Sequence, residues 1–428
     1  MKLLWAVSTV GTGHVYRNVE IARELRSLLG PLEVTWVSGG PAAKALSCEG
    51  ACLDLLPVVP IPVRDGWLDV ITFARNWLGC DRQSHSVSRE IITRQRPDAV
   101  LADEVPSFAL AARDFGLPAI YLTDLLAFDF ARPFWRSAVF NLILALGGWM
   151  MDRAIRRAYE KLDLIVLLND VESLPAGWRR WASRHCLIAA PVARKTDALA
   201  LSRDEVRREL GLTPADRLIV VTVGGSDMGR QLVRTAGQAF TVIKQAVPEA
   251  ALLVVLGSMI EAESCGVAPG DGVTIRQYEP DLVSYLAASD LVICNSGLST
   301  LTEIALRAKV PTITSPIGSH WEQEGNARAA AASGYAVKID RVRLNPRTLA
   351  QTAIGILTDA DRSQRMVEAA RAIEDRDAAS IAAKGIADLL SRRSGGIRYA
   401  GLVDERCLGN ERSEVGTNIA KKLDDSEA

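Results

Sequence analysis

The sequence of 428 residues has few cysteines, few histidines and almost no net charge. Its seven cysteines are odd in number and include no CxxC unit, so they give no sign of a disulfide framework and favour a reduced, cytoplasmic compartment. The formal net charge of −1 offers no electrostatic reason to expect a nucleic-acid partner. No cofactor and no metal site is predicted.

The sequence also lacks a hydrophobic run of membrane-spanning length. The longest one, Ala138 to Met151, contains Asn141 and two glycines, and it is shorter than the roughly 20 residues that a spanning helix needs. Arginines flank it on both sides, at positions 132, 136, 153, 156 and 157. One interpretation is a helix on an anionic lipid surface, with residues 132–157 touching the inner face of the cell membrane; the other is a buried or cleft-lining helix.

At the start of the chain, Leu3 to Val7 is too short for the apolar region of a signal peptide and is expected to be a strand.

The length and the 48% hydrophobic content predict two globular domains. Short β-type runs alternate with helix-length segments, the pattern of parallel sheets built from βαβ units. The alternation lapses from Ala190 to Ser202, which is expected to be a hinge. The predicted fold is α/β with two Rossmann-like domains, residues 1–193 and 194–392, followed by a disordered tail at 393–428. The predicted strands are Leu3–Ser8, Glu33–Ser38, Ala99–Ala102, Ala119–Leu122, Leu164–Leu168, Leu218–Val223, Ala251–Leu256, Leu291–Cys294 and Pro311–Thr314.

The first candidate site is the glycine turn from Gly11 to His14, between the first strand and the first helix. Ligands bind doubly wound folds at this edge, the carboxyl ends of the strands. The turn is not a dinucleotide fingerprint, because Tyr16 replaces the third glycine of GxGxxG, and NAD binding is disfavoured. His14, at the start of the helix, suits a general base. The alternative is a histidine that caps the helix or hydrogen-bonds the loop.

Asp103 directly follows the predicted strand Ala99–Ala102, so it is expected at the same sheet edge as His14. An aspartate there could orient the imidazole. Its alternative role is to cap the helix that begins near Pro106, and Glu104 competes with it for either role. The sequence does not place Asp103 within reach of His14.

In the second half, Gly224, Gly225 and Ser226 again follow a strand. A stronger unit comes after the predicted strand Leu291–Cys294, where a polar glycine turn leads into a helix that presents its N-terminus and hydroxyls to an anion. The candidate residues of this turn and helix are Asn295, Ser296, Gly297, Ser299, Thr300 and Glu303. After the next strand, Glu322 and Gln323 form an acid–amide pair that can bind sugar hydroxyls.

These motifs together resemble the GT-B glycosyltransferases, most closely the family of the N-acetylglucosaminyltransferase that makes the lipid intermediate of peptidoglycan. The resemblance covers about Leu3 to Leu390. The motifs that carry it are the Gly11 to His14 turn with Arg17, Gly224 to Ser226, Asn295 to Gly297 with Thr302 and Glu303, and Glu322 to Ala327. The resemblance implies an enzyme with an acceptor-side N-terminal domain and a nucleotide-sugar-binding C-terminal domain.

The resemblance also implies roles for individual residues. Backbone near Tyr278 and Glu279 would meet the base of UDP, Ser296 to Thr300 the diphosphate, and Glu303 the ribose. Gly13, Gly225, Ser226, Asn295, Gly297, Glu322 and Gln323 complete the expected donor site. As in related plant and antibiotic glycosyltransferases, His14 would act as base with Asp103 as partner, inverting the anomeric centre without a metal ion.

The resemblance leaves the acceptor open, since Leu55 to Met150 matches no subfamily, and lipid-linked, glycan and small-molecule acceptors all remain. Asn295 also departs from the pattern, because the plant enzymes have a histidine there. Gly13, His14 and Arg17 resemble in addition a UDP-sugar hydrolase of pseudaminic acid synthesis. A UDP-N-acetylglucosamine 2-epimerase and a non-catalytic nucleotide-sugar-binding subunit are further alternatives.

Overall fold

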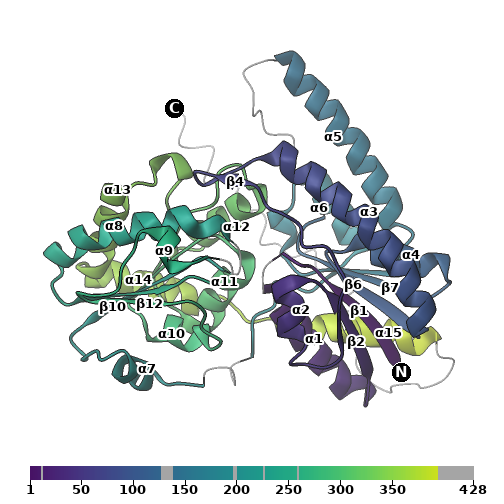
Figure 1. The fold of residues 1–428 in the computed structure, drawn as a ribbon, viewed down its shortest axis with the longest axis horizontal. Coiled ribbons are helices and arrows are strands. Elements are labelled where there is room, and N and C mark those ends of the chain that lie inside the picture. The colour runs from purple at the N-terminus through teal and green to yellow at the C-terminus, as the bar shows by residue number, and fades with distance from the viewer. Residues whose placement is uncertain (11–12, 127–137, 196–199, 225–226, 258–259, 394–428) are drawn as a thin grey trace, which may run out of the picture. The chain divides into compact units, whose positions relative to one another are not determined.

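The computed structural model describes residues 1–428 except 11–12, 127–137, 196–199, 225–226, 258–259 and 394–428. The described chain forms two parallel β-sheets with helices on their faces (Figure 1). The predicted α/β class with two Rossmann-like parallel sheets is confirmed. The predicted tail falls almost entirely on residues outside the described part of the chain.

The first sheet has seven strands in the order β3-β2-β1-β6-β7-β8-β9, and every pairing between them is parallel. A short antiparallel pair, β4 and β5, precedes the long helix α3. The elements of this half are β1 Lys2–Val7, α1 Gly13–Leu29, β2 Glu33–Ser38, α2 Gly40–Leu46, β3 Cys52–Asp54, β4 Val63–Arg64, β5 Trp67–Leu68, α3 Val70–Gln95, β6 Ala99–Asp103, α4 Pro106–Asp114, β7 Ala119–Thr123, α5 Ala138–Tyr159, β8 Leu164–Leu167, α6 Ala176–His185 and β9 Leu187–Ile188.

The second sheet has six parallel strands in the order β12-β11-β10-β13-β14-β15. Its elements are α7 Arg203–Glu209, β10 Arg217–Thr222, α8 Arg230–Ala246, β11 Ala250–Val255, α9 Ala262–Cys265, β12 Val273–Arg276, α10 Leu282–Ala288, β13 Leu291–Cys294, α11 Leu298–Glu303, β14 Thr312–Thr314, α12 Trp321–Ala332, β15 Ala336–Lys338, α13 Pro346–Leu357, α14 Ala360–Arg371 and α15 Ala378–Arg393.

The strands of both sheets are apolar on both faces, as parallel strands covered by helices must be. In β1, Leu3, Trp5 and Val7 enter the core on one face, while Leu4 and Ala6 enter the core on the other. The second sheet likewise has a core on each face. Burial on both faces explains why these strands appear in the sequence as short, nearly continuous hydrophobic runs.

Local sequence sets where several helices begin. Ser202 and Glu205 form a reciprocal capping box at α7, and Asn345 accepts a hydrogen bond from the backbone N–H of Thr348 ahead of a proline at the first position of α13. Asp69 caps the 26-residue helix α3 in the same way. The sequence did not predict α3, because its apolar positions are interrupted by polar residues.

The chain reverses its strand order at equivalent points in the two sheets. In the first sheet the strands on either side of β1 are β2 and β6; in the second, those on either side of β10 are β11 and β13. Loops at such a point diverge to opposite faces of the sheet and leave a crevice at the carboxyl ends of the strands. The strands that the predicted glycine turns follow, β1, β10 and β13, all lie at these two points.

Helix α15 follows the second sheet in sequence but packs in the core of the first. Its buried residues Ala382, Ala383 and Ile386 belong to the same hydrophobic cluster as Leu3 and Trp5, and Figure 1 shows α15 beside β1 and β2. The predicted domain 194–392 included this helix. The contact shows that the chain returns to the first sheet before it reaches the tail.

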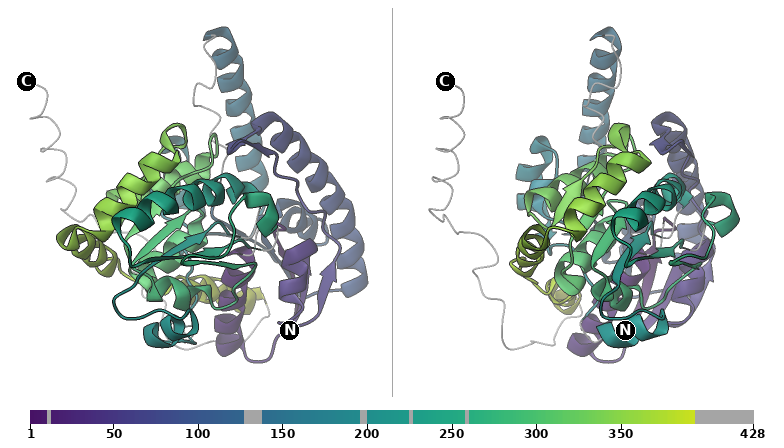
Figure 2. Two further views of the ribbon diagram at one scale, coloured as in Figure 1. Left: turned by 60° about the vertical axis from the view of Figure 1, so that its left-hand side comes forward. Right: turned by 90° about the vertical axis from the view of Figure 1, so that its left-hand side faces the viewer.

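The apolar run from Ala138 to Met151 forms the first part of helix α5 (Ala138–Tyr159). In Figures 1 and 2 this helix projects away from the first sheet in every view. Among the described residues, no helix is long and apolar enough to cross a membrane.

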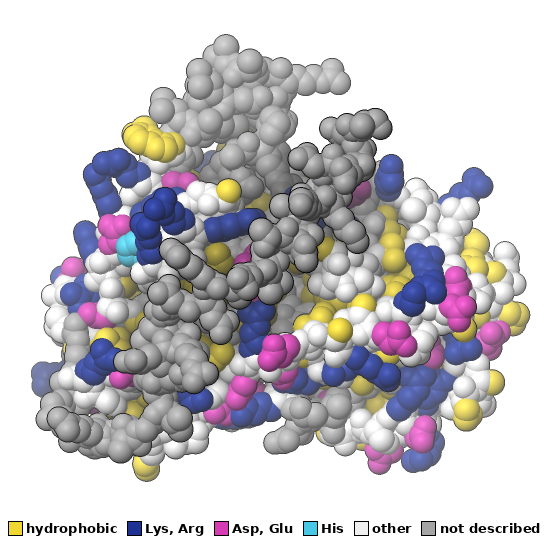
Figure 3. Space-filling model, turned by 180° about the vertical axis from the view of Figure 1, so that it is seen from behind, with side chains coloured by type: hydrophobic (Ala, Val, Ile, Leu, Met, Phe, Trp, Pro, Cys, Tyr) yellow, Lys and Arg dark blue, Asp and Glu magenta, His cyan; other side chains and the backbone are white. Residues whose placement is uncertain are grey.

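On the face drawn in Figure 3, the coloured Lys and Arg side chains lie among Asp and Glu side chains, in keeping with the small net charge.

Candidate active site

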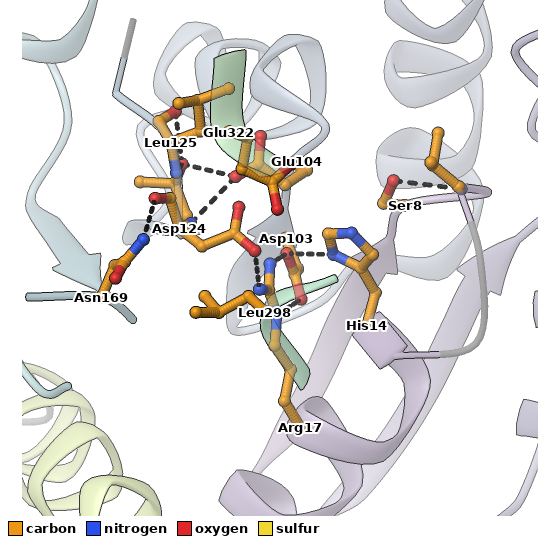
Figure 4. A network of polar contacts seen from close by, with 12 residues as sticks. Ser8, His14, Arg17, Asp103, Glu104, Asp124, Leu125, Asn169, Leu298 and Glu322 are labelled. Carbon is orange, nitrogen blue, oxygen red and sulfur yellow. Dashed lines mark hydrogen bonds and ion pairs between the residues drawn. The ribbon is translucent and has the colours of Figure 1, made fainter. Parts of the chain in front are cut away.

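His14 and Asp103 lie where the strand order of the first sheet reverses. His14 follows β1 and Asp103 ends β6, and the two strands pair with Val7 opposite Asp103. The imidazole Nδ1 of His14 is 3.2 Å from Oδ1 of Asp103, whose side chain is fully buried (Figure 4). The structure therefore brings together the two residues that were predicted as base and partner.

Arg17, one turn further along α1, joins this pair to a second acidic residue, Asp124. Its Nε donates to Asp103 Oδ2 at 2.8 Å, its second terminal nitrogen donates to Asp103 Oδ1, and its first donates to Asp124 Oδ2 at 2.6 Å. Asn18 also donates to Asp103. Burial raises the pKa of Asp103, but the charges of Arg17 and His14 and their hydrogen bonds outweigh burial and hold that pKa below its usual range. An ionised Asp103 accepts the hydrogen on His14 Nδ1.

Glu104 has a backbone conformation that few non-glycine residues adopt, with φ of 55°. Its Oε1 accepts hydrogen bonds from the Thr123 hydroxyl at 2.5 Å and from the backbone N–H of Asp124 at 3.0 Å. Burial, and then the negative charge of Asp124, raise the pKa of Glu104 well above its usual value. Strained backbone of this kind is often found at functional sites.

The segment around the start of α12 brings His320 and Glu322, from the second half of the chain, to the cavity that Glu104 and Asp124 also line. His320 caps α12 through Nδ1, which accepts from the backbone N–H of Gln323, and burial lowers the pKa of His320 to about 4. Burial and the charge of Asp124 raise the pKa of Glu322 to about 8. Figure 4 shows Glu322 close to Glu104 and Asp124. Several acidic groups therefore share one small region beside His14.

A cavity of about 400 Å³ opens over His14. Helix α3, helix α5 and the loops after β1, β6 and β7 supply most of its wall. Its polar lining includes Glu104, Asp124, His320 and Glu322, and the rest is mainly apolar. A second cavity of about 850 Å³ shares Asp124, Trp321 and Glu322 with the first and extends along α12.

The glycine turn after β13 lies against the turn after β1. A Cβ added at Gly13 would lie 2.6 Å from the hydroxyl of Ser299, so only glycine permits this approach without adjustment.

The Asn295 side chain is 5% exposed, and neither its amide nitrogen nor its amide oxygen has a partner among the described residues. Buried amides are normally hydrogen-bonded, so this one is available to a ligand. Ser296 is different, since its hydroxyl is fully buried and lies 2.9 Å from the hydroxyl of Thr314.

Glu303 is paired within the protein. Arg194 holds both carboxylate oxygens, with Nε 2.6 Å from Oε1 and its second terminal nitrogen 3.1 Å from Oε2. The Arg194 guanidinium also lies over the ring of Tyr16, 4.4 Å from its centroid. Tyr16 in turn contacts Tyr278, with 2.5 Å between their hydroxyl oxygens. The carboxylate predicted to bind a ribose thus has a cationic partner in this structure.

The other predicted donor residues lie around the same turn. Gly297 caps α11, and Thr300 is half-buried within it. The side-chain oxygen of Gln323 accepts from the backbone N–H of Ile317 at 3.0 Å, which orders the loop that carries His320. Gly225 and Ser226 lie outside the described residues. Among the described residues, no three His, Cys, Asp or Glu side chains are grouped so as to hold a metal ion.

Residues 218–383 match the glycosyltransferase family 28 C-terminal domain. An uncharacterised glycosyltransferase of Methanopyrus kandleri is 25% identical over 339 residues, 77% of this chain and 90% of the relative. The UDP-N-acetylglucosamine–N-acetylmuramyl-(pentapeptide) pyrophosphoryl-undecaprenol N-acetylglucosamine transferase of Moorella thermoacetica is 26% identical over 378 residues, 84% of this chain and 92% of the relative.

Solved structures share the fold. The glycosyltransferase of kitacinnamycin superimposes with a TM-score of 0.64 at 18% identity, over 91% of this chain and 99% of that one. A putative UDP-N-acetylglucosamine 2-epimerase from Listeria monocytogenes superimposes with a TM-score of 0.59 at 14% identity, over 92% of this chain and 96% of that one. Structural likeness at this level of identity shows the fold alone. The activity of the chain follows from the family match and the relatives. The chain is a glycosyltransferase of the GT-B fold.

Three residues of the candidate active site were not predicted. Asp124 comes just after the predicted strand Ala119–Leu122, and the reasoning that singled out Asp103 at a strand end could have found it. His320 lies between the predicted strand Pro311–Thr314 and the predicted pair Glu322 and Gln323, and no role was predicted for it. Arg194 lies at the predicted hinge, and no local pattern indicated that it would pair with Glu303, since 109 residues separate the two.

Proposed function

We propose that this glycosyltransferase moves a sugar from a UDP-sugar to a hydroxyl acceptor, with inversion of the anomeric centre and without a metal ion. The observation that carries the proposal is the hydrogen-bonded pair of His14 and Asp103 beneath a mainly apolar cavity. The names of relatives support UDP as the nucleotide, since the Moorella thermoacetica enzyme is named for a UDP-sugar donor.

The orientation of His14 suits a general base. Because Nδ1 faces the ionised Asp103, the proton of the neutral ring belongs on Nδ1, and Nε2 keeps its lone pair. Nε2 then takes the proton of the acceptor hydroxyl. The acceptor oxygen forms a bond to the anomeric carbon, while the bond from that carbon to the diphosphate breaks and UDP leaves with the electron pair. Displacement on the face opposite the leaving group inverts the anomeric centre.

The donor is proposed to bind along the second sheet. The unpartnered Asn295 amide, the hydroxyls of Ser299 and Thr300, and the first backbone N–H groups of α11 would meet the diphosphate and its growing charge. Gly225 and Ser226 would contribute backbone from the turn after β10. Glu322 and Gln323 would meet the sugar, and Tyr278, which is half-exposed, would lie beside the base.

Glu303→Ala is expected to raise the KM for the donor about 10- to 100-fold, with little change in kcat. Glu303 would bind the ribose hydroxyls, and hydrogen bonds to a charged group contribute about 1.5–3 kcal/mol. Initial-rate kinetics with varied donor at saturating acceptor measure the effect. Glu249→Ala, an exposed glutamate of the same half, serves as the matched control and should leave the KM unchanged. An unchanged KM in Glu303→Ala would remove Glu303 from the donor site.

The test of the proposed function is UDP release from a panel of UDP- and dTDP-sugars by the purified protein, with and without a lipid and small-molecule extract. We expect release that depends on the extract and persists in EDTA. Equal release without the extract would identify a hydrolase. Conversion of the donor without free UDP would identify an epimerase, and binding of UDP without turnover would identify a binding subunit.

We also propose that α5 touches the membrane surface while the enzyme works. Trp149 and Met150 are each 60% exposed, and the Arg153 guanidinium lies 5.8 Å from the Trp149 ring centroid. Exposed apolar side chains beside arginines are typical of helices at an anionic lipid interface. The flanking segment 132–137 of this proposed contact lies outside the described residues.

A further inference from the structure

The cavity over His14 is mainly apolar away from its base. Hydrophobic side chains from α3, α5 and the loop before β4 form much of its wall. They include Leu56, Pro57, Val59, Ile61, Phe73, Trp77, Ile155 and Ala158. A ligand that fills this space therefore buries apolar surface, which is the main source of affinity in such a pocket.

The charged side chains among the described lining residues of the same cavity are mainly acidic. Four are carboxyl groups, Asp81, Glu104, Asp124 and Glu322, and the described lining residues include no lysine or arginine. The remaining ionisable groups in the lining, apart from Cys80 and the tyrosines, are His14 and His320, and burial holds the pKa of His320 at about 4.

The Arg17 guanidinium, which contacts the lining residue Asp124, is fully occupied by carboxylates of the protein. All three nitrogens of Arg17 donate to Asp103 and Asp124, and Arg17 is only 5% exposed. Among the described residues, an anion in the cavity would meet carboxyl groups and no free cation, and burial of an unpaired charge is strongly unfavourable. Arg17 thus neutralises part of the acidic cluster but offers no donor to a ligand.

We infer that the acceptor is an uncharged apolar alcohol or phenol, because the cavity buries apolar surface and, among the described residues, offers no free cation to an acceptor with an anionic group next to its hydroxyl. The inference rests on the proposed function and specifies the acceptor that the function left open. It separates this chain from the pyrophosphoryl-undecaprenol acceptor named for the Moorella thermoacetica relative, in which the diphosphate adjoins the sugar.

A cationic acceptor fits less well, because burial opposes ionisation of three of the carboxyl groups that face the cavity, and the fourth, Asp124, is already paired with Arg17. Burial raises the pKa of Glu104 well above its usual value and that of Glu322 to about 8, and it raises the pKa of Asp81 as well. A protonated carboxyl group donates a hydrogen bond to a neutral hydroxyl or carbonyl oxygen. The chemistry at the base of the cavity therefore suits a neutral polar group.

The test measures binding of three matched ligands to the full chain without donor, by calorimetry at about pH 7. The ligands are the methyl ester of β-hydroxypalmitic acid, the free acid, and a long-chain amino alcohol. We expect the ester to bind at least about 10-fold more tightly than the acid, and no more weakly than the amino alcohol. Three results would each overturn the inference. They are tighter binding of the acid or of the amino alcohol than of the ester, equal binding of acid and ester, and no binding of the ester by protein that binds UDP.

Two variants test the source of the selection. Glu104→Gln and Glu322→Gln keep the shape of the neutral carboxyl groups and exclude their ionised form, so the preference for ester over acid should remain, and loss of that preference would contradict the inference. Glu90→Gln, at an exposed position on α3, is the control and should leave the preference unchanged. Since binding is measured without turnover, failure of the acceptor inference is distinct from failure of sugar transfer, which is tested by UDP release.

Discussion

Replacement of His14 by alanine is expected to lower kcat about 1,000-fold, while the affinity for UDP changes less than about threefold. General base catalysis contributes roughly 10²- to 10⁴-fold to rates, and Arg17 and Asn18, the other described side chains that donate to Asp103, cannot take the acceptor proton. His14 belongs to the first sheet, whereas the proposed UDP contacts lie on the second, so binding and catalysis should separate. Single-turnover rates and calorimetry with UDP measure the two effects.

Two further variants test whether the effect belongs to the pair. Asp103→Asn should lower kcat in the same direction, because an amide at this position no longer fixes the proton on His14 Nδ1. His85→Ala changes an exposed histidine of α3 and should leave kcat unaltered. If His14→Ala kept more than about a tenth of the wild-type kcat, His14 would not be the base.

Replacement of Arg17 by methionine is expected to lower the free energy of unfolding by about 3–5 kcal/mol at neutral pH, the range found when one partner of a buried ion pair is removed. Arg17 is the cation that Asp103 and Asp124 share, and Asp103 is fully buried. Without it, two carboxylates would stay close together in the interior. Denaturant unfolding followed by tryptophan fluorescence measures the change.

The same variant should show a characteristic pH dependence. In the native protein, Arg17 holds the pKa of Asp103 and of Asp124 below their usual values against the opposing effect of burial, so their stabilisation is complete above about pH 4 and is lost as the pH falls further. In Arg17→Met, burial without a cation raises both pKa values, so the destabilisation is greatest at neutral pH and is relieved as the pH falls toward about 4.5. The difference between native and variant protein should therefore narrow over that range.

An exposed ion pair provides the control for Arg17. Arg89 pairs with Asp114, and both side chains are about half exposed. Arg89→Met should change the free energy of unfolding by less than about 1 kcal/mol both at neutral pH and at about pH 4.5, because solvent screens such pairs. An equally small and pH-independent change in Arg17→Met would show that the buried cluster does not contribute as proposed.

The strands and the places of the glycine turns could be predicted because each depends on neighbours in the sequence. A short hydrophobic run such as Leu291–Cys294 needs only local backbone pairing and burial to become a strand, and a parallel strand must end at the same edge as its neighbours. His14 and Asp103 were predicted at one sheet edge for this reason. The helix α3 was missed because polar residues interrupt its apolar positions.

Strand order was decided only by the tertiary structure. Until β1 pairs with β6, nothing in the sequence brings Asp103 within 3.2 Å of His14, because 89 residues separate them. The pairing of Arg194 with Glu303, the position of Arg17 between Asp103 and Asp124, and the return of α15 to the first core all arise in the same way.

The sequence by itself thus determined the α/β class, the two sheets, and the set of residues at the carboxyl ends of their strands, because these follow from periodicity and short-range backbone geometry. The tertiary structure alone decided which of those residues meet, which carboxyl groups are neutralised, and that the cavity over His14 is apolar with acidic groups at its base. Contacts between distant segments set burial and charge pairing, and these set the protonation and chemistry of the site.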